Sequence, residues 1–311
     1  MSAYRDSGVL VTGGAGVIGR ELIESLLAQG ARVACCDLKP RPGWLDPAVT
    51  YIEGDAAELG AGDLGALEPA YCFHLAATFE RTVETPGFWA ENFHHNVLVS
   101  HRVATLAGEL PSLRRLVFAS SYLVYDPALY LFEQPPDAPH ALSEDTPLRP
   151  RNLCGSAKLM HEQELEFLAR FPSRFSSLSA RIFRVYGRGS SDVVSRWVRS
   201  LRADPDTPLA AFRVEGMFDY VYAGDAAEGL LRLGAGETTG AVNLGSGRAR
   251  RVSELLEILA RRFPGASWAE EPAEIAFEAH QADIARLEQV TGWHPPTSLE
   301  QGVDILAEHE A

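Results

Sequence analysis

The sequence predicts an α/β fold that combines a doubly wound parallel sheet with a smaller second domain. First, a glycine-rich turn joins an apolar run at residues 8–11 to a run with helical periodicity at residues 20–27. Second, strand and helix patterns alternate to about residue 180, which is typical of parallel strands joined by helices. Beyond that point the alternation loosens, which favours a smaller domain interleaved with the first.

The glycine-rich turn has the spacing of a dinucleotide-binding motif. It reads Thr12-Gly13-Gly14-Ala15-Gly16-Val17-Ile18-Gly19. Glycines at positions 13, 16 and 19 permit a tight turn, close approach of the backbone to a pyrophosphate and close packing of helix on strand. The first helical residues, Val17 and Ile18, would then present their N–H groups to the phosphates. This pattern predicts a Rossmann domain.

The ends of the next strands supply the other expected cofactor contacts. A strand at residues 32–36 ends at Asp37, at the distance where an acid accepts hydrogen bonds from the adenosine ribose. A carboxylate there repels a 2′-phosphate and so favours NAD over NADP, although Lys39 and Arg41 lie close by. Two further strands, at residues 50–53 and 71–75, continue this edge of the sheet. The cofactor contacts expected from them are Asp55, Ala56, Leu75, Ala76 and Ala77.

The remaining pattern sets the expected elements and domains. Helices are expected at residues 92–107, 158–169, 193–201 and 252–263, and strands at 113–119, 177–183, 219–222 and 241–244. Residues 126–151 are rich in proline and acid and are expected to form a long loop, which in compact domains is often a lid. We expect an NAD-binding domain at residues 1–180 and a mainly substrate-binding domain at 181–311. Residues 219–245 are expected to return to the first domain.

Composition excludes several classes of function. With 311 residues, 46% of them hydrophobic and 23% charged, the chain has the profile of an ordinary globular protein. A net charge of −14 argues against a nucleic-acid surface. No apolar run approaches the roughly 20 residues that span a bilayer, and no secretory leader is evident, so the expected location is the cytoplasm. Four cysteines are too few for a disulfide scaffold.

The histidines do not predict a metal site. The pair His161-Glu162 lacks a second histidine four residues on. His94 and His95 are neighbours in an expected helix, which would place their rings on different faces. No metal is therefore predicted.

Several motifs together resemble one family. Residues 119–125 end the fifth expected strand, and residues 154–158 open a helix with the text Cys-Gly-Ser-Ala-Lys. With the glycine motif and the segments 181–187, 219–225, 243–247 and 291–295, they resemble the extended short-chain dehydrogenases/reductases, the group of sugar-nucleotide epimerases and dehydratases. The resemblance covers nearly the whole chain. It implies a bound NAD that takes a hydride from a sugar hydroxyl and often returns it.

The resemblance also implies catalytic roles. Ser121 matches the residue that hydrogen-bonds the reacting hydroxyl, and Lys158 matches the lysine that binds the nicotinamide ribose. Four residues before this lysine the family has a tyrosine base, whereas this chain has Cys154. Positions i and i+4 share a helix face, so the lysine ammonium would favour the thiolate. Either Cys154 replaces the base, or it is passive and Tyr122, Glu80 or the substrate's own groups transfer the proton.

Other departures from the family concern the substrate. The acidic pair of the family's dehydratases is replaced by Tyr122-Leu123, which disfavours a standard 4,6-dehydratase. Phe218 replaces an arginine that grips the substrate diphosphate, and residues 277–281 lack a second one. Fewer cations favour a substrate with less phosphate, unless Arg184 and Arg188 compensate. The expected substrate contacts are Thr78, Ser121, Tyr122, Arg184, Arg188 and Phe218.

The expected function is therefore transient oxidation of a sugar hydroxyl by an NAD-dependent epimerase or dehydratase. The ketone acidifies the adjacent C–H bond, which enables epimerisation or β-elimination before the hydride returns. A nucleoside or small sugar is the expected substrate, for example in 5,6-dehydration during nucleoside-antibiotic synthesis, a form of specialised metabolism. The alternatives are a nucleotide-sugar 4-epimerase with a displaced base and a non-catalytic NAD-binding regulatory protein. The resemblance further implies a homodimer.

Overall fold

The computed structural model describes residues 2–79, 84–171 and 175–309. Its contacts divide the chain into two units. Unit 1 comprises Met1–Tyr125, Leu148–Arg181 and Ala227–Val242, and unit 2 comprises Asp126–Pro147, Ile182–Ala226 and Asn243–Ala311. The boundary expected from the sequence, at residue 180, would place residues 126–147 in the first domain, whereas the structure groups them with unit 2. The segment that returns to unit 1 is 227–242, inside the range 219–245 expected from the sequence.

Unit 1 is built on a seven-stranded sheet in the order β12-β8-β5-β4-β1-β2-β3. Strands β1 to β5 run parallel to one another. The strands are β1 (Gly8–Thr12), β2 (Arg32–Asp37), β3 (Thr50–Glu53), β4 (Pro69–His74), β5 (Arg115–Ser121), β8 (Ser176–Ile182) and β12 (Gly240–Leu244). This order reverses direction at β1 and confirms the predicted doubly wound sheet.

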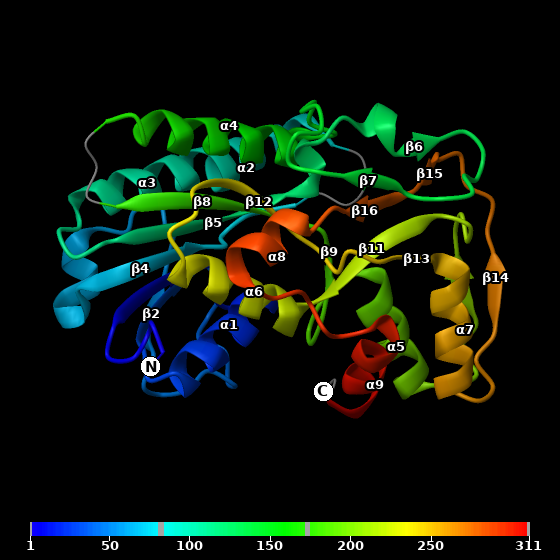
Figure 1. Ribbon diagram of the computed structural model, residues 1–311. Coiled ribbons are helices and arrows are strands. Elements are labelled where there is room, and N and C mark those ends of the chain that lie inside the picture. Colours follow the sequence, from blue (N-terminus) through cyan, green and yellow to red (C-terminus); the bar gives the residue numbers. More distant parts are fainter. Residues whose placement is uncertain (1, 80–83, 172–174, 310–311) are drawn as a thin grey trace. The chain divides into compact units, whose positions relative to one another are not determined.

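Helices cover both faces of this sheet. Figure 1 shows α2, α3 and α4 on one face and α1 and α6 on the other. The helical segments are α1 (Val17–Ala28), η1 (Ala61–Leu67), α2 (Pro86–Asn92), η2 (Phe93–Leu98), α3 (Val99–Glu109), η3 (Tyr122–Val124), α4 (Leu153–Leu168) and α6 (Ala223–Ala235). Among the described residues, no helix has the length and apolar character that crossing a membrane requires.

The helix expected at residues 92–107 differs from a regular α-helix. Helical structure begins earlier, at Pro86, and is interrupted by the π-helical turn η2 before α3 continues to Glu109. A π-helical turn closes i→i+5 hydrogen bonds, so it rotates the side chains that follow relative to an α-helix. Apolar periodicity over the whole segment does not reveal such a local change.

One hydrophobic cluster of unit 1 lies between the sheet and helices α3 and α4. Leu10, Ala34 and Leu116 from three strands pack in one cluster with Val103 of α3 and Leu165 of α4. Because all five side chains are buried, they fix the helices against the sheet. The carboxyl ends of the parallel strands consequently meet at one edge, where ligands bind in such folds.

Unit 2 contains shorter elements around its own core. They are η4 (Pro127–Leu129), β6 (Leu131–Phe132), β7 (His140–Leu142), β9 (Arg184–Tyr186), α5 (Val193–Ala203), β10 (Leu209–Ala211), β11 (Met217–Tyr222), β13 (Ala249–Arg251), α7 (Val252–Arg262), β14 (Trp268–Glu270), β15 (Phe277–Glu278), β16 (His280–Ala282), α8 (Ala285–Thr291) and α9 (Leu299–His309). Trp197 of α5, Leu255 of α7 and Val303 of α9 lie in one buried cluster. The three helices thus share a single core.

The segment expected to be a long loop is partly paired instead. Strand β6 pairs antiparallel with β15, and β7 pairs parallel with β16. The backbone N–H of Asn243 donates to Glu144, 2.7 Å away, which adds a further tie within unit 2. These bonds hold residues 126–147 in unit 2, so the expected long loop is present but contains two short paired strands.

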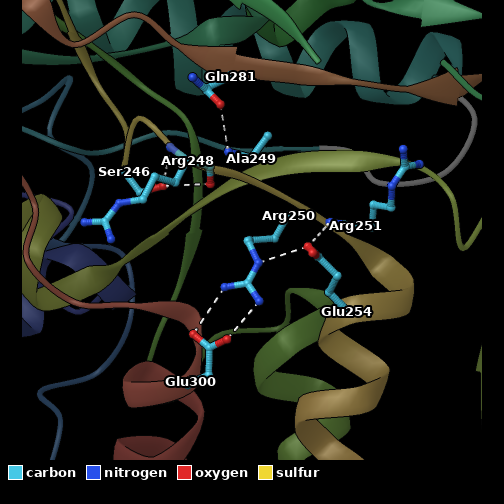
Figure 2. Close-up of polar contacts among 8 residues, drawn as sticks. All are labelled: Ser246, Arg248, Ala249, Arg250, Arg251, Glu254, Gln281 and Glu300. Atoms are coloured by element: carbon cyan, nitrogen blue, oxygen red, sulfur yellow. Dashed lines mark hydrogen bonds and ion pairs between the residues drawn. The ribbon is translucent and has the colours of Figure 1, made fainter. Parts of the chain in front are cut away.

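An arginine on β13 joins two helices of unit 2. Figure 2 shows the Arg250 guanidinium between Glu254 of α7 and Glu300 of α9. Its nitrogens lie 2.8 and 3.2 Å from the two Glu300 oxygens, a bidentate arrangement, and 2.9 Å from Glu254. This hydrogen bonding lowers the pKa of Glu300 to about 2. The ion pairs therefore fasten α9 to β13 over most of the pH range.

Candidate active site

A cradle for a dinucleotide lies at the end of β1. Gly13 has a φ of +74°, and a Cβ there would come within 2.5 Å of the Ala76 nitrogen, so only glycine fits. Gly16 is the N-cap of α1, and no side chain caps the helix. The N–H groups of Val17 and Ile18 in its first turn are thus available to a pyrophosphate. Gly19 lies under the turn, where a Cβ would be 2.6 Å from the Gly14 Cα.

A pocket of about 230 Å³ extends from this cradle along the strand ends. The expected cofactor contacts that line it are Gly13, Gly16, Asp37, Asp55, Ala56, Leu75, Ala76 and Ala77. They come from the ends of β1, β2, β3 and β4, so the sheet brings together residues spread over more than sixty positions of the chain. The donor set and the glycine cradle fit NAD.

Asp37 is held in place by backbone donors. The N–H of Ala15 donates to its Oδ2 at 2.9 Å, and the N–H of Lys39 donates to its Oδ1 at 3.0 Å. Each carboxylate oxygen can accept a further hydrogen bond. The carboxylate is therefore fixed at the pocket wall and retains acceptor capacity for ribose hydroxyls.

Asp55 bonds His94, whose ring meets that of His95, although the sequence predicted the two rings on different helix faces. Its Oδ2 lies 2.5 Å from the Nε2 of His94, and its Oδ1 accepts from the Ala57 N–H at 2.9 Å. Burial tends to raise the pKa of Asp55, but the bonds from Ala57 and His94 outweigh burial and lower it. The rings of His94 and His95 are 4.7 Å apart between centroids, so the expectation that they point to different helix faces was wrong.

The second part of the site lies where β5 meets α4. Ser121 ends β5, and Tyr122 begins the short turn η3, where it is buried. Gly155 in the first turn of α4 lies against the backbone of Leu123, where a Cβ would overlap the carbonyl. The close approach brings the segment with Cys154 to the segment with Ser121. The two halves of the predicted catalytic motif therefore belong to packed elements.

Lys158 is buried on α4 and points to β5. Its Nζ donates to the Ala119 carbonyl at 2.7 Å and lies 4.6 Å from the centroid of the Phe118 ring. Burial lowers its pKa below the ordinary value. Within the described part of the chain, the Lys158 ammonium donates one hydrogen bond, to Ala119. Two of its three N–H donors therefore remain for a bound ribose. This arrangement fits the nicotinamide end of NAD.

The structure contradicts the expected thiolate at Cys154. Burial raises the pKa of this thiol, and the opposing effect of Lys158 does not overcome it. Glu84 also raises it, and the same carboxylate accepts a hydrogen bond from the N–H of Leu153 at 2.9 Å. At neutral pH the side chain is an un-ionised thiol, which is neither a strong base nor a strong nucleophile. Glu80, the alternative acid named from the sequence, lies outside the described residues.

Sequence reasoning missed a buried network that supports this site. Glu162 lies one turn after Lys158 on α4, accepts a short hydrogen bond from Ser120, and pairs with Arg181 at 2.8 Å. Arg181 also donates to the Tyr125 hydroxyl at 3.1 Å. The i, i+4 spacing of Lys158 and Glu162 was the available sequence signal, since it puts both on one helix face.

The expected substrate contacts lie in both units. In unit 1, Thr78 donates its hydroxyl to Glu91 at 2.7 Å. In unit 2, the Arg184 guanidinium lies 3.0 Å from buried Glu278 and 3.9 Å from the centroid of the Phe218 ring. Arg188 follows β9 and is partly exposed. The charge of Arg184 is therefore balanced by a neighbouring carboxylate, which sequence reasoning did not anticipate.

The fold and the cradle define an NAD-binding enzyme of the Rossmann class. A model of the NAD dependent epimerase/dehydratase family matches residues 9–245. The chain belongs to this family of NAD-dependent enzymes.

Similar proteins agree with this assignment. The chain is 28% identical over 316 residues to a UDP-glucose 4-epimerase of Mycolicibacterium smegmatis, covering 94% of this chain and 95% of that protein. It resembles the structure of MoeE5 in complex with UDP-glucuronic acid and NAD, with 28% identity, a TM-score of 0.80 and coverage of 97% and 98%. It also resembles TunA, an NDP-hexosamine 5,6-dehydratase of tunicamycin biosynthesis, with 26% identity, a TM-score of 0.81 and coverage of 96% of this chain and 96% of TunA.

The position of Asp37 yields a test of cofactor choice. The variant Asp37→Ala loses a charged acceptor worth about 1.5–3 kcal/mol per hydrogen bond, so NAD should bind about tenfold to a hundredfold more weakly. Affinity for NADP should change much less. Titration calorimetry with both cofactors measures this, with Glu58→Ala, an exposed acid near the same edge, as the matched control. Tighter binding of NADP than of NAD by the unaltered protein would contradict the role given to Asp37.

Proposed function

We propose that the protein is an epimerase or dehydratase that oxidises a hydroxyl of a nucleoside or small sugar transiently, without requiring a full substrate diphosphate. The specific reaction that we propose is 5,6-dehydration of the sugar during the synthesis of a nucleoside antibiotic. NAD, when bound, supplies the hydride acceptor and donor for such chemistry. The observation that carries the proposal is the pairing of Arg184 with Glu278 beside Phe218. The carboxylate offsets the positive charge that a diphosphate would need.

The residues of unit 1 have separate roles in this proposal. Lys158 holds the nicotinamide ribose with its two open N–H donors. Ser121 hydrogen-bonds the reacting hydroxyl. Because Cys154 is un-ionised, the proton passes to Tyr122, to Glu80 or to a group of the substrate. Among the described residues, Tyr122 is the candidate that adjoins Ser121 directly.

The neighbouring proteins support the chemistry without fixing the substrate. TunA is named as a 5,6-dehydratase, and the M. smegmatis protein as a UDP-glucose 4-epimerase. Both act on nucleotide sugars by name, so a nucleotide-sugar 4-epimerase remains the second candidate. The pairing of Arg184 with Glu278 favours the first candidate, an enzyme that acts on a nucleoside or small sugar without a full diphosphate.

A gain-of-function variant tests the substrate class. Common UDP- and dTDP-sugars should bind the NAD-loaded protein weakly. The variant Phe218→Arg adds a second cation beside Arg184, so the one carboxylate of Glu278 no longer balances the local positive charge, and UDP affinity should rise about tenfold to a hundredfold. Phe212→Arg, at an exposed aromatic position of unit 2, is the matched control and should change little. Calorimetric titration gives both values.

Two results would reject this substrate class. Micromolar binding of a UDP- or dTDP-sugar by the unaltered protein would restore the 4-epimerase. An equal gain in Phe218→Arg and Phe212→Arg would show that the added charge acts nonspecifically.

We also propose that the protein forms a homodimer through the helices beside the sheet. Four large apolar side chains, each more than half exposed, lie on helical segments of unit 1 that contact one another. They are Trp89, Phe93, Met160 and Phe167. Exposed apolar side chains gathered in this way mark interaction surfaces, and a second copy would bury them.

Sedimentation equilibrium tests the homodimer. The unaltered protein should sediment as a dimer, and the double variant Trp89→Glu/Phe167→Glu as a monomer, because buried unpaired carboxylates disfavour the contact. Trp268→Glu, on exposed β14 of unit 2, should leave the dimer intact. A monomeric unaltered protein, or a dimer that survives the double substitution, would contradict the proposed surface.

A further inference from the structure

Three potential metal ligands meet beside the cofactor pocket. One oxygen of Asp55 and one ring nitrogen each of His94 and His95 all lie within 4.8 Å of one another. Asp55 follows β3, and the two histidines come from η2, some forty positions later in the chain. Two imidazoles and a carboxylate form a donor set that suits divalent transition metals.

The π-helical turn accounts for the convergence. In an α-helix, neighbouring side chains project about 100° apart, which separates two adjacent rings. Here both histidines lie within the π-helical stretch Phe93–Leu98, and their rings meet at an interplanar angle of 82°. Such turns are rare and occur frequently at functional sites. The local backbone thus turns adjacent histidines toward a shared partner.

The donor atoms are oriented for a cation. The N–H of Ala57 holds one Asp55 oxygen at 2.9 Å and leaves the other facing His94. That second oxygen lies within hydrogen-bonding distance of the His94 Nε2, 2.5 Å away, and a metal ion can take the place of the bridging hydrogen. No described residue hydrogen-bonds the ring of His95, which lines the pocket. Its lone pair is therefore open to a ligand from the pocket.

The distances suit a small ion after modest adjustment. Zinc bonds of about 2.0–2.2 Å to nitrogen and oxygen place tetrahedral ligand atoms roughly 3.4 Å apart. The His94 and Asp55 atoms are already closer than this, and partly exposed rings can rotate to close the longest separation. Three protein ligands leave a fourth position for water, as in open zinc sites.

We propose that Asp55, His94 and His95 bind a divalent transition-metal ion such as Zn²⁺, and that this ion competes with NAD for the pocket. Competition follows because Asp55 and His95 line the same pocket that fits the cofactor. An ion held there occupies the Asp55 carboxylate and part of the pocket volume. The metal thus acts as an inhibitor of cofactor loading and takes no part in the reaction at Lys158.

Direct binding to the cofactor-free protein tests this site. Zn²⁺ is titrated calorimetrically into protein without a polyhistidine tag, and Co²⁺ is used in parallel because its visible absorption reports coordination by nitrogen and oxygen. One-to-one binding is expected. The variants His95→Gln and His94→Gln should each weaken Zn²⁺ binding at least about tenfold. Substitution of residues that only hydrogen-bond a metal ligand already lowers metal affinity about 10–100-fold, and these variants remove a ligand itself. His294→Gln, exposed in unit 2, is the matched control and should leave the affinity unchanged.

Competition supplies the second measurement. NAD at a hundredfold excess over its dissociation constant should weaken apparent Zn²⁺ affinity about a hundredfold, and bound Co²⁺ should lose its absorption when NAD is added. Circular dichroism confirms that each variant is folded. The proposal is overturned if the unaltered protein binds no Zn²⁺, if both glutamine variants bind it as tightly as the unaltered protein does, or if saturating NAD leaves its affinity unchanged.

Discussion

Two buried charges on α4 hold the catalytic elements of unit 1 together. Lys158 bonds the carbonyl of Ala119, and Glu162, one helical turn later, bonds the hydroxyl of Ser120. Both partners lie at the end of β5, so the helix is tied to consecutive residues of one strand. Arg181 neutralises Glu162 at 2.8 Å. Removing one partner of such a buried pair typically costs about 3–5 kcal/mol, which makes this connection a strong constraint on the geometry of the site.

This constraint produces a buried reaction site in which two ionisable side chains, Cys154 and Lys158, lose contact with water. Packing α4 against β5 buries Cys154 and Lys158 together, and burial acts on both in the direction of the neutral form. The lysine stays available as a hydrogen-bond donor, whereas the cysteine keeps its proton. The cofactor pocket at the neighbouring strand ends is polar by contrast, with Asp37 and Asp55 held by backbone N–H groups. One sheet edge thus combines a polar cofactor wall with a desolvated reaction site.

Most residues that line the candidate cofactor pocket could be named from local sequence, because they sit at fixed offsets from strand ends. Gly13 and Gly16 follow β1 and Asp37 ends β2, and both strands lie where the sequence predicts them. Features set by contacts between distant segments were not predictable. Glu278 lies 94 positions from Arg184, so nothing near the arginine indicated that its charge is balanced. The positions of the His94 and His95 rings depend on a π-helical turn, which apolar periodicity does not encode. The ionisation of Cys154 depended on burial, which spacing from Lys158 alone did not reveal.

The most direct test of the account is the reaction rate of the variant Cys154→Ala. The rate is measured in a single turnover, from the absorbance of reduced nicotinamide, with a panel of nucleosides and small sugars as substrates. The account predicts a transient rise and fall of this signal, with rates within about tenfold of the unaltered protein, because an un-ionised thiol contributes no general-base catalysis. Under the same conditions Tyr122→Phe and Glu80→Gln show which group takes the proton. A loss of about 10²–10⁴-fold in Cys154→Ala, the usual contribution of a general base, would contradict the account and make Cys154 the base.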